Sequence, residues 1–168
     1  AVLVSDQVAE RLDHAGVRVA ASVVASGSAH GEENNAVRRV SRRAYSHAGI
    51  DVAALDLAEI HDATASAEIK LYEDLGFAAI GEGADLIRAD LTTYGGNIVV
   101  NPSGGLLAKG HPIGATGIAQ IVEATEQLRG AAGERQVSGA RWALTQNAGG
   151  WIDTDNAAVA VTLLEGQA

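Results

Sequence analysis

The feature that most constrains this chain is a glycine-dense segment, NPSGGLLAKGHPIGATG, at residues 101–117. It follows a strand-like stretch at 97–100 and runs into an amphipathic pattern at 113–128 that predicts a helix. Glycine lets the main chain approach a ligand closely, and a helix that starts here leaves N–H groups free at its positive end. The segment therefore indicates a backbone cradle that presents His111 to a polarised or anionic group. The alternative is a connecting loop with an incidental surface histidine.

Two further blocks carry polar residues in ordered patterns. The first reads EIHDAT at 59–64 and is followed by YEDLGF at 72–77, and the second reads QNAGG at 146–150. Together with the glycine segment, these blocks resemble the thiolase superfamily, in particular the sterol-carrier-protein-2-type thiolases, also called lipid-transfer proteins. The similarity spans residues 17–164. It implies the C-terminal half of a layered, thiolase-like α/β fold, a mixed sheet with helices on both faces.

Periodicity gives the same fold class without the resemblance. Apolar runs and alternation predict strands, three- and four-residue spacing predicts helices, and their alternation along the chain is typical of an α/β layered fold. We expect strands at 17–25, 57–61, 97–100, 141–146 and 157–164, helices at 32–48, 64–75 and 113–128, and a hairpin connection at 149–156.

The resemblance also implies a division into domains. Residues 1–15 are similar to the end of the family's N-terminal half, and residues 16–168 to its C-terminal domain. The chain contains no methionine and begins in a strand-like phrase, so we expect it to be incomplete. In this family the first half carries the nucleophilic cysteine, which we expect to lie outside these 168 residues.

Composition excludes several classes of function. The formal net charge of −9 argues against a nucleic-acid surface, which needs clustered Lys and Arg. The absence of cysteine excludes disulfides, thiolate metal sites and a thiol nucleophile in this segment, and no metal-ligand spacing is present. No apolar run approaches the roughly 18–20 residues that span a bilayer, and no signal peptide is visible. We expect a cytoplasmic protein without a membrane span.

The histidines of two blocks suit thioester chemistry, which places negative charge on a carbonyl oxygen. A rigid donor aimed at that oxygen contributes about 3–4 kcal/mol, and a neutral imidazole can donate a hydrogen bond or accept a thiol proton. The resemblance implies that His111 activates the nucleophile of the other half and holds a thioester oxygen. His61 would hold a water or substrate oxygen opposite it. From the residues alone, His61 could equally be a strand-end histidine bonded to backbone.

The sequence also suggests roles for residues other than the two histidines. Asn147 could shape the floor of the site, although we interpret it as a turn-forming residue. Thr64 can cap the helix that begins there. Asp62, which points away from His61 on a strand, is predicted to cap the same helix or to orient a neighbour. His47 matches no motif and is interpreted as a surface residue. The resemblance implies four substrate-binding residues: Gly110, Asn147, Gly149 and Gly150.

One departure bears on the activity. Where the resembling branch often has cysteine in an HDCF block, this chain has Ala63 and then Thr64. Our leading interpretation is a thiolase-like acyltransferase of the acetyl-CoA acetyltransferase type, or a lyase that cleaves C–C bonds thiolytically or by a retro-aldol step, acting on lipid or steroid acyl-CoA thioesters. The alternative is a catalytically reduced protein that binds acyl-CoA or scaffolds a partner subunit.

The resemblance also suggests binding partners. Coenzyme A thioesters would be substrates, with no permanently bound cofactor. A homodimer is expected, together with a small zinc-binding OB-fold protein that completes the acyl-CoA site.

Overall fold

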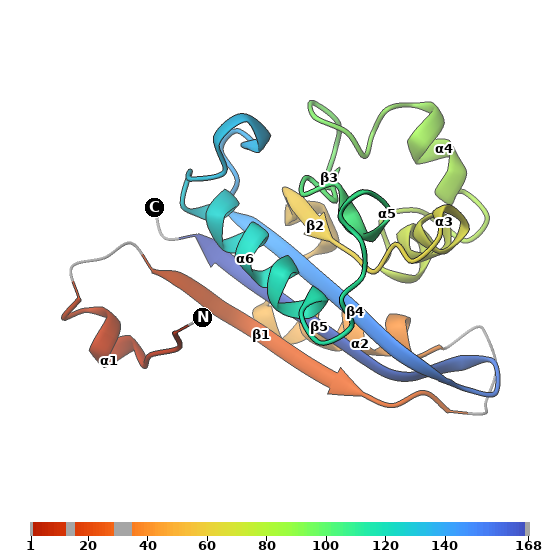
Figure 1. The fold of residues 1–168 in the computed structure, drawn as a ribbon, viewed down its shortest axis with the longest axis horizontal. Helices are drawn as coiled ribbons and strands as arrows, with labels where there is room; N and C mark the ends of the chain where they lie inside the picture. The colour runs from red at the N-terminus through yellow and green to blue at the C-terminus, as the bar shows by residue number, and fades with distance from the viewer. Residues whose placement is uncertain (1, 13–15, 29–34, 167–168) are drawn as a thin grey trace.

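The chain folds around one five-stranded sheet with the strand order β1-β5-β4-β2-β3 (Figure 1). The computed structural model describes residues 2–12, 16–28 and 35–166. Its strands are β1 (Val17–Ala25), β2 (Leu57–Glu59), β3 (Val99–Val100), β4 (Trp142–Ile152) and β5 (Asp155–Gly166). Its helices are α1 (Asp6–Ala9), α2 (Ala36–Ala48), η2 (Val52–Ala54), α3 (Ala65–Asp74), α4 (Gly83–Arg88), α5 (Gly105–Lys109), α6 (Thr116–Leu128) and η3 (Gly133–Arg135).

The sheet is mixed, and helices cover both of its faces. β1, β5 and β4 pair antiparallel, whereas β2 pairs parallel with both β3 and β4. In Figure 1, α6 crosses in front of the sheet and α2 lies behind it. The predicted α/β fold class is confirmed. Within the described residues, no helix is both long enough and apolar enough to cross a bilayer.

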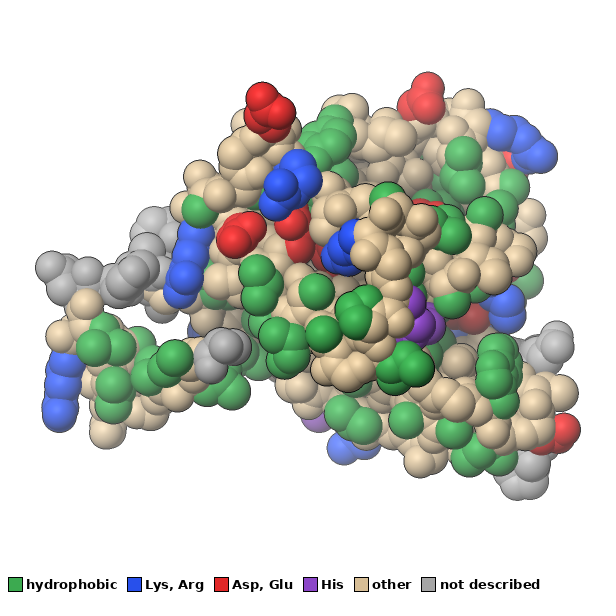
Figure 2. Space-filling model, viewed as in Figure 1, with side chains coloured by type: hydrophobic (Ala, Val, Ile, Leu, Met, Phe, Trp, Pro, Cys, Tyr) green, Lys and Arg blue, Asp and Glu red, His purple; other side chains and the backbone are tan. Residues whose placement is uncertain are grey.

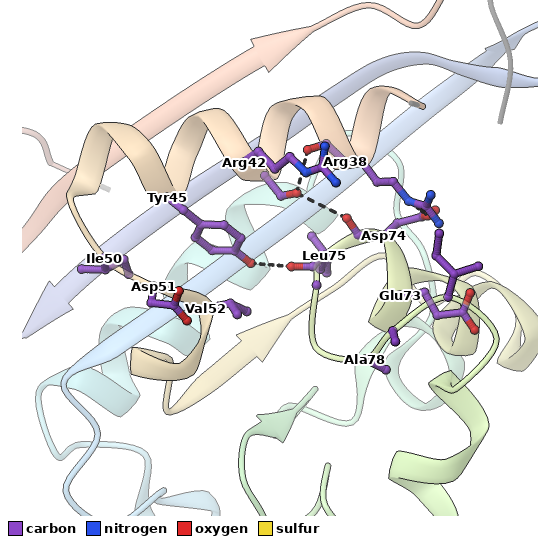
Figure 3. A pocket seen from close by; sticks show the side chains of 14 residues that line it. Arg38, Arg42, Tyr45, Ile50, Asp51, Val52, Glu73, Asp74, Leu75 and Ala78 are labelled. Atoms are coloured by element: carbon purple, nitrogen blue, oxygen red, sulfur yellow. Dashed lines mark hydrogen bonds and ion pairs between the residues drawn. The ribbon is translucent and has the colours of Figure 1, made fainter. Parts of the chain in front are cut away.

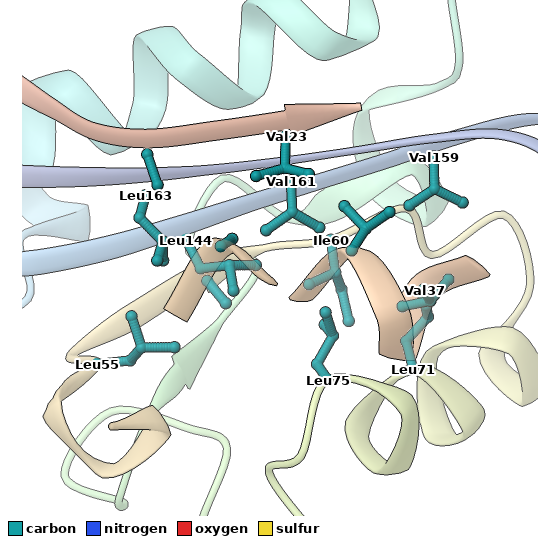
Figure 4. Close-up of a cluster of buried hydrophobic side chains, with 14 of the residues drawn as sticks. Val23, Val37, Leu55, Ile60, Leu71, Leu75, Leu144, Val159, Val161 and Leu163 are labelled. Carbon is teal, nitrogen blue, oxygen red and sulfur yellow. The ribbon is translucent and has the colours of Figure 1, made fainter. Parts of the chain in front are cut away.

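Each face of the sheet buries its own apolar cluster. Behind the sheet, Val161 and Leu163 of β5 pack with Val37 of α2 and with Leu71 and Leu75 (Figure 4). A second, smaller apolar cluster lies on the other face of the sheet, under α6. Apart from Tyr72, the buried members of both clusters are Ala, Val, Ile and Leu side chains. The second cluster comprises Leu57, Val99, Ala124, Leu128, Val137, Ala143 and Leu164.

Local signals place the helix ends. The Asn35 side chain accepts a hydrogen bond from the Arg38 N–H at 3.0 Å, and Gly49, with φ +70°, ends α2. Thr64 accepts from the Ala67 N–H at 3.1 Å and caps α3. α3 agrees with the helix predicted at 64–75, and α2 ends at Ala48 as predicted. The start predicted at residue 32 differs, because Asn35 is an extended N-cap and α2 begins at Ala36; residues 32–34 lie outside the described residues.

The connection between the last two strands is much shorter than predicted. β4 continues to Ile152 and β5 starts at Asp155, so most of the expected 149–156 connection is paired strand. Gly149 pairs with Ala158, and the exposed Trp151 lies near the tip. Glycine is disfavoured in strands, and this suggested a loop. Pairing with a long neighbouring strand overrides that local preference.

Asp155 joins this hairpin to α2, and it provides a test of the fold. The carboxylate is 4% exposed and accepts hydrogen bonds from the Ala36 N–H at 3.0 Å and the Asn156 N–H at 2.8 Å. We expect Asp155→Asn to lower the unfolding free energy by about 2 kcal/mol, because the amide offers one acceptor oxygen and no charge. Denaturant unfolding measures this.

The matched control is Asp153→Asn, at an exposed position with φ +55°. Asparagine tolerates this backbone conformation, so we expect a change within about 0.5 kcal/mol. Equal effects of the two substitutions would contradict the role of Asp155.

Candidate active site

The two histidines that the sequence analysis singled out lie against each other. The ring centroids of His61 and His111 are 4.8 Å apart, and the rings meet edge to face at 89°. His61 follows the C-terminal end of β2, and His111 lies between α5 and α6. The parallel pairing of β2 with β3 brings these segments together, because the chain enters the glycine segment directly from β3.

Side-chain amides hold the backbone at His61 where the β2 ladder ends. The Ile60 N–H donates to Asn101 Oδ1 at 2.8 Å, and the His61 N–H donates to Gln146 Oε1 at 3.0 Å. These bonds replace the main-chain partners that a longer strand would have. The ring nitrogen Nε2 of His61 is buried and has no hydrogen-bond partner among the described residues. It is available to a ligand.

The environment of His61 favours the neutral imidazole. Burial lowers the pKa of His61 below its ordinary value of 6.5, and the neighbouring His111 lowers this pKa further. Asp62 acts in the opposite direction but is a smaller influence. A neutral ring can donate from Nε2 when Nδ1 carries the lone pair.

His111 has a hydroxyl partner in the first turn of α6. The buried Thr116 Oγ1 lies 2.7 Å from His111 Nδ1 and donates to the Pro112 carbonyl oxygen at 3.2 Å. Since a hydroxyl has one proton, Thr116 in this arrangement accepts a hydrogen bond from Nδ1–H. His111 Nε2 then carries the lone pair and can accept a proton.

Two carboxylates from the His61 block hold the glycine segment. Glu59 is fully buried and accepts hydrogen bonds from the Ser103 N–H at 2.9 Å and the Ser103 hydroxyl at 2.7 Å. Burial raises the pKa of Glu59, and the bonds from Ser103 oppose that rise. Asp62 accepts from the Leu106 N–H at 2.7 Å and the Leu107 N–H at 3.3 Å, at the start of α5. The predicted Thr64 cap of α3 is confirmed. Of the two roles predicted for Asp62, capping that helix is therefore wrong, and its carboxylate holds the start of α5 instead.

A cavity of about 450 Å³ opens beside both imidazoles. We call it the dihistidine cavity. Asn147, Gly149 and Gly150 line it with His61 and His111, whereas Gly110 is not among its lining residues. Asn147 was interpreted as a turn residue, but it lies within β4, pairs with Ala160 and donates to Gln120 Oε1 at 3.2 Å. Gly110 ends α5 with φ +82°.

A second cavity, of about 350 Å³, lies between α2 and the C-terminal end of α3 (Figure 3). There the Tyr45 hydroxyl donates to the Leu75 carbonyl oxygen at 2.9 Å, and burial raises the pKa of Tyr45. Neither His61 nor His111 lines this cavity, so it is separate from the candidate site. Within the described residues, no group of three or more His, Asp or Glu side chains is placed to hold a metal ion.

Comparison with known proteins identifies the family of the chain. Residues 21–162 match the family model described as thiolase C-terminal domain-like. The chain belongs to this family. Sterol carrier protein 2 of Bos taurus is 47% identical over 112 residues, which are 67% of this chain and 21% of that protein. The acetyl-CoA acetyltransferase of Methanothermobacter thermautotrophicus is 44% identical over 140 residues, covering 80% of this chain and 37% of that enzyme.

A solved structure supports the fold of this thiolase-like chain. The Ltp2-ChsH2(DUF35) aldolase superimposes with a TM-score of 0.82 at 22% identity, covering 97% of this chain and 43% of that one. This chain therefore covers less than half of the length of each of these three proteins.

Several residues of the site escaped the sequence analysis. Gln146, fully buried, orients the His61 backbone, Thr116 contacts the His111 ring, and Asn101 supports Ile60. All three lie in the sequence blocks described above, where they stood out only as polar residues. Buried polar oxygens normally have a hydrogen-bond donor, as Gln146 Oε1 and Asn101 Oδ1 have here.

The contact between Asp62 and Gly105 yields a stability prediction. A Cβ at Gly105 would lie 2.1 Å from Asp62 Oδ2, and the glycine has φ +64°. We expect Gly105→Ala to cost at least ~2 kcal/mol of unfolding free energy, because it forces a strained backbone and displaces the carboxylate. As a control in the same segment, a Cβ at Gly114 meets no atom within 4 Å, and Gly114→Ala should stay within about 0.5 kcal/mol.

The environment of His61 predicts its titration. NMR should show the His61 ring titrating below pH 6.5, and its pKa should rise in His111→Ala because the neighbouring charge is removed. Because the pKa of His61 is lower in the folded state, the unfolded state binds the imidazole proton more readily just below pH 6.5. The unfolding free energy should therefore fall as the pH drops through 6.5. A His61 pKa above 6.5 in the folded protein would contradict this account.

Proposed function

We propose that this chain is the C-terminal half of a thiolase-like enzyme that acts on acyl-CoA thioesters, with coenzyme A thioesters as substrates and no permanently bound cofactor. The observation that carries the proposal is the edge-to-face contact of His61 and His111 beside one cavity. Both imidazoles keep a ring nitrogen that can serve a ligand, Nε2 in each case.

His111 acts as the base. Its Nε2 accepts the proton of a cysteine thiol supplied from outside these residues, and the thiolate attacks the thioester carbonyl carbon. The protonated Nε2–H then donates to the carbonyl oxygen, which has become negative. When the carbonyl reforms, the CoA thiolate leaves and takes the proton from His111, which leaves an acyl-cysteine. Thr116 keeps Nδ1 occupied throughout, so the proton moves only at Nε2.

His61 acts as the second donor to the thioester oxygen, and the glycines of β4 let the substrate approach the main chain. The buried and unpartnered Nε2 of His61 supports this role. Gly110, Asn147, Gly149 and Gly150 remain proposed substrate-binding residues. The lining of the dihistidine cavity supports all of them except Gly110.

The exposed apolar face of α6 supports a partner half. Ile118 and Val122 of α6 are 56% and 45% exposed, and Ile113, just before the helix, is 86% exposed. Figure 2 shows apolar side chains gathered over this region. Monomeric proteins rarely expose contiguous apolar patches of large area. We propose that the half with the nucleophilic cysteine packs there.

The proposed reaction is acyl transfer, or cleavage of a C–C bond by thiolysis or by a retro-aldol step. The proposed substrates are lipid or steroid acyl-CoA thioesters. We further propose a cytoplasmic homodimer with a small zinc-binding OB-fold partner. The aldolase neighbour, whose name includes a DUF35 component, supports the partner subunit.

The test is the His111→Ala variant of the full-length protein. Turnover of an acyl-CoA thioester should fall at least about a hundredfold, because the base and one oxyanion donor are lost together. Mass spectrometry of the wild type after incubation with acyl-CoA should detect a covalent acyl adduct. The control is His47→Ala, at an exposed position on α2, with turnover unchanged.

Near-normal turnover in His111→Ala would remove this mechanism. Reversible acyl-CoA binding without an adduct would instead support a catalytically reduced protein that binds acyl-CoA or scaffolds a partner subunit. The absence of cysteine here, with Ala63 in the His61 block, motivates that second candidate.

A further inference from the structure

We propose that a cavity of about 220 Å³ between α2, α3 and the tip of the β4–β5 hairpin binds the acyl chain of the thioester whose carbonyl oxygen lies at His61. We call it the acyl cavity. This inference rests on the proposed function and adds the substrate's apolar end to it.

The acyl cavity adjoins the candidate site, because the two cavities share lining residues. His61, Ala148, Gly149 and Gly150 line both the acyl cavity and the dihistidine cavity. His61, just past the C-terminal end of β2, therefore borders both cavities. A thioester carbonyl that reacts beside His111 can direct its two substituents into different cavities.

The inner end of the acyl cavity suits a hydrogen-bond acceptor. His61 Nε2 and Gln146 Nε2 are both buried without a partner among the described residues, and both side chains line this cavity. Gln146 is fully buried, and its Oε1 is already engaged by the His61 N–H. Buried donors normally have partners, so a ligand oxygen at this end would satisfy them.

The walls of the acyl cavity suit a hydrocarbon chain. Val37 of α2 and Ala67 and Leu71 of α3 face it with aliphatic groups. The charged groups that line it have partners: Lys70 Nζ lies 3.1 Å from Asp74 Oδ2, and Asp155 accepts hydrogen bonds from main-chain N–H groups. A polar inner end followed by an apolar wall matches an acyl group, with its carbonyl at one end and methylenes behind it.

The volume sets the length of that chain. At about 30 Å³ for each heavy-atom-sized group, 220 Å³ holds about seven groups, which indicates acyl chains of about six to eight carbons. Ala63 also lines the cavity, and its small side chain leaves this room.

The experiment measures binding of a series of thioesters to the full-length protein by calorimetry. The probes are coenzyme A and its acetyl, butanoyl, hexanoyl, octanoyl and dodecanoyl thioesters. Affinity should rise about fourfold for each methylene buried and level off after octanoyl-CoA. Hydrogen exchange should show added protection of α3 with octanoyl-CoA and less with acetyl-CoA, a readout that needs no variant.

The variant is Ala67→Phe, whose ring fills the acyl cavity. It should bind acetyl-CoA like the wild type and lose at least tenfold in affinity for octanoyl-CoA. The matched control is Ala65→Phe on the same helix, at an exposed residue that does not line the cavity, and it should behave like the wild type.

Three results would overturn the inference. If Ala67→Phe keeps the full dependence on chain length, or if coenzyme A binds as tightly as its octanoyl thioester, the acyl chain lies elsewhere while the proposed function stands. If no coenzyme A thioester binds at all, both the inference and the proposed function are wrong.

Discussion

The site depends on the hydrogen bonds by which two carboxylates hold the glycine segment against the end of β2. Glu59 and Asp62 flank the Ile60–His61 dipeptide in sequence, and both reach across to main-chain N–H groups between residues 103 and 107. His61 and His111 are 50 positions apart in the sequence. Because the carboxylates bind backbone, they fix the path of the chain that leads to His111. The contact between the imidazoles follows from that path.

Glycine at position 105 is required by the same bonds. A side chain there would occupy the space of the Asp62 carboxylate, so the close approach of carboxylate to main chain is possible only without a Cβ. On the other side, Asn101 and Gln146 hold the backbone of Ile60 and His61 where main-chain pairing stops. The end of β2 thus leaves a histidine whose backbone is held while its Nε2 remains unpartnered.

Much of the fold was predictable because it is encoded locally. The boundaries of β1 agree with the apolar run at residues 17–25, and the cap at Thr64 was visible as a residue type at the right distance. The extent of the β4–β5 hairpin was not predictable from local sequence. Gly149 and Gly150 disfavour a strand locally, but β4 stays extended there because it pairs with β5. The partners of Asp62 and Gln146 depend on contacts between residues 44 to 85 positions apart, and no local pattern predicts such contacts.

The two histidines have different hydrogen-bond partners, and this difference supports the separate roles proposed for them, a donor for His61 and a base for His111. Asp62 follows His61 directly, yet its oxygens accept from the Leu106 and Leu107 N–H groups, and burial lowers the pKa of His61. A histidine without a partner at Nε2 in a desolvated position is a better donor than base, because protonation there is opposed. His111 is more exposed and has Thr116 at Nδ1, so it can take up a proton at Nε2 and remain oriented. An acid–base group and a fixed donor side by side are what a reaction needs when it moves a proton and charges an oxygen in the same step.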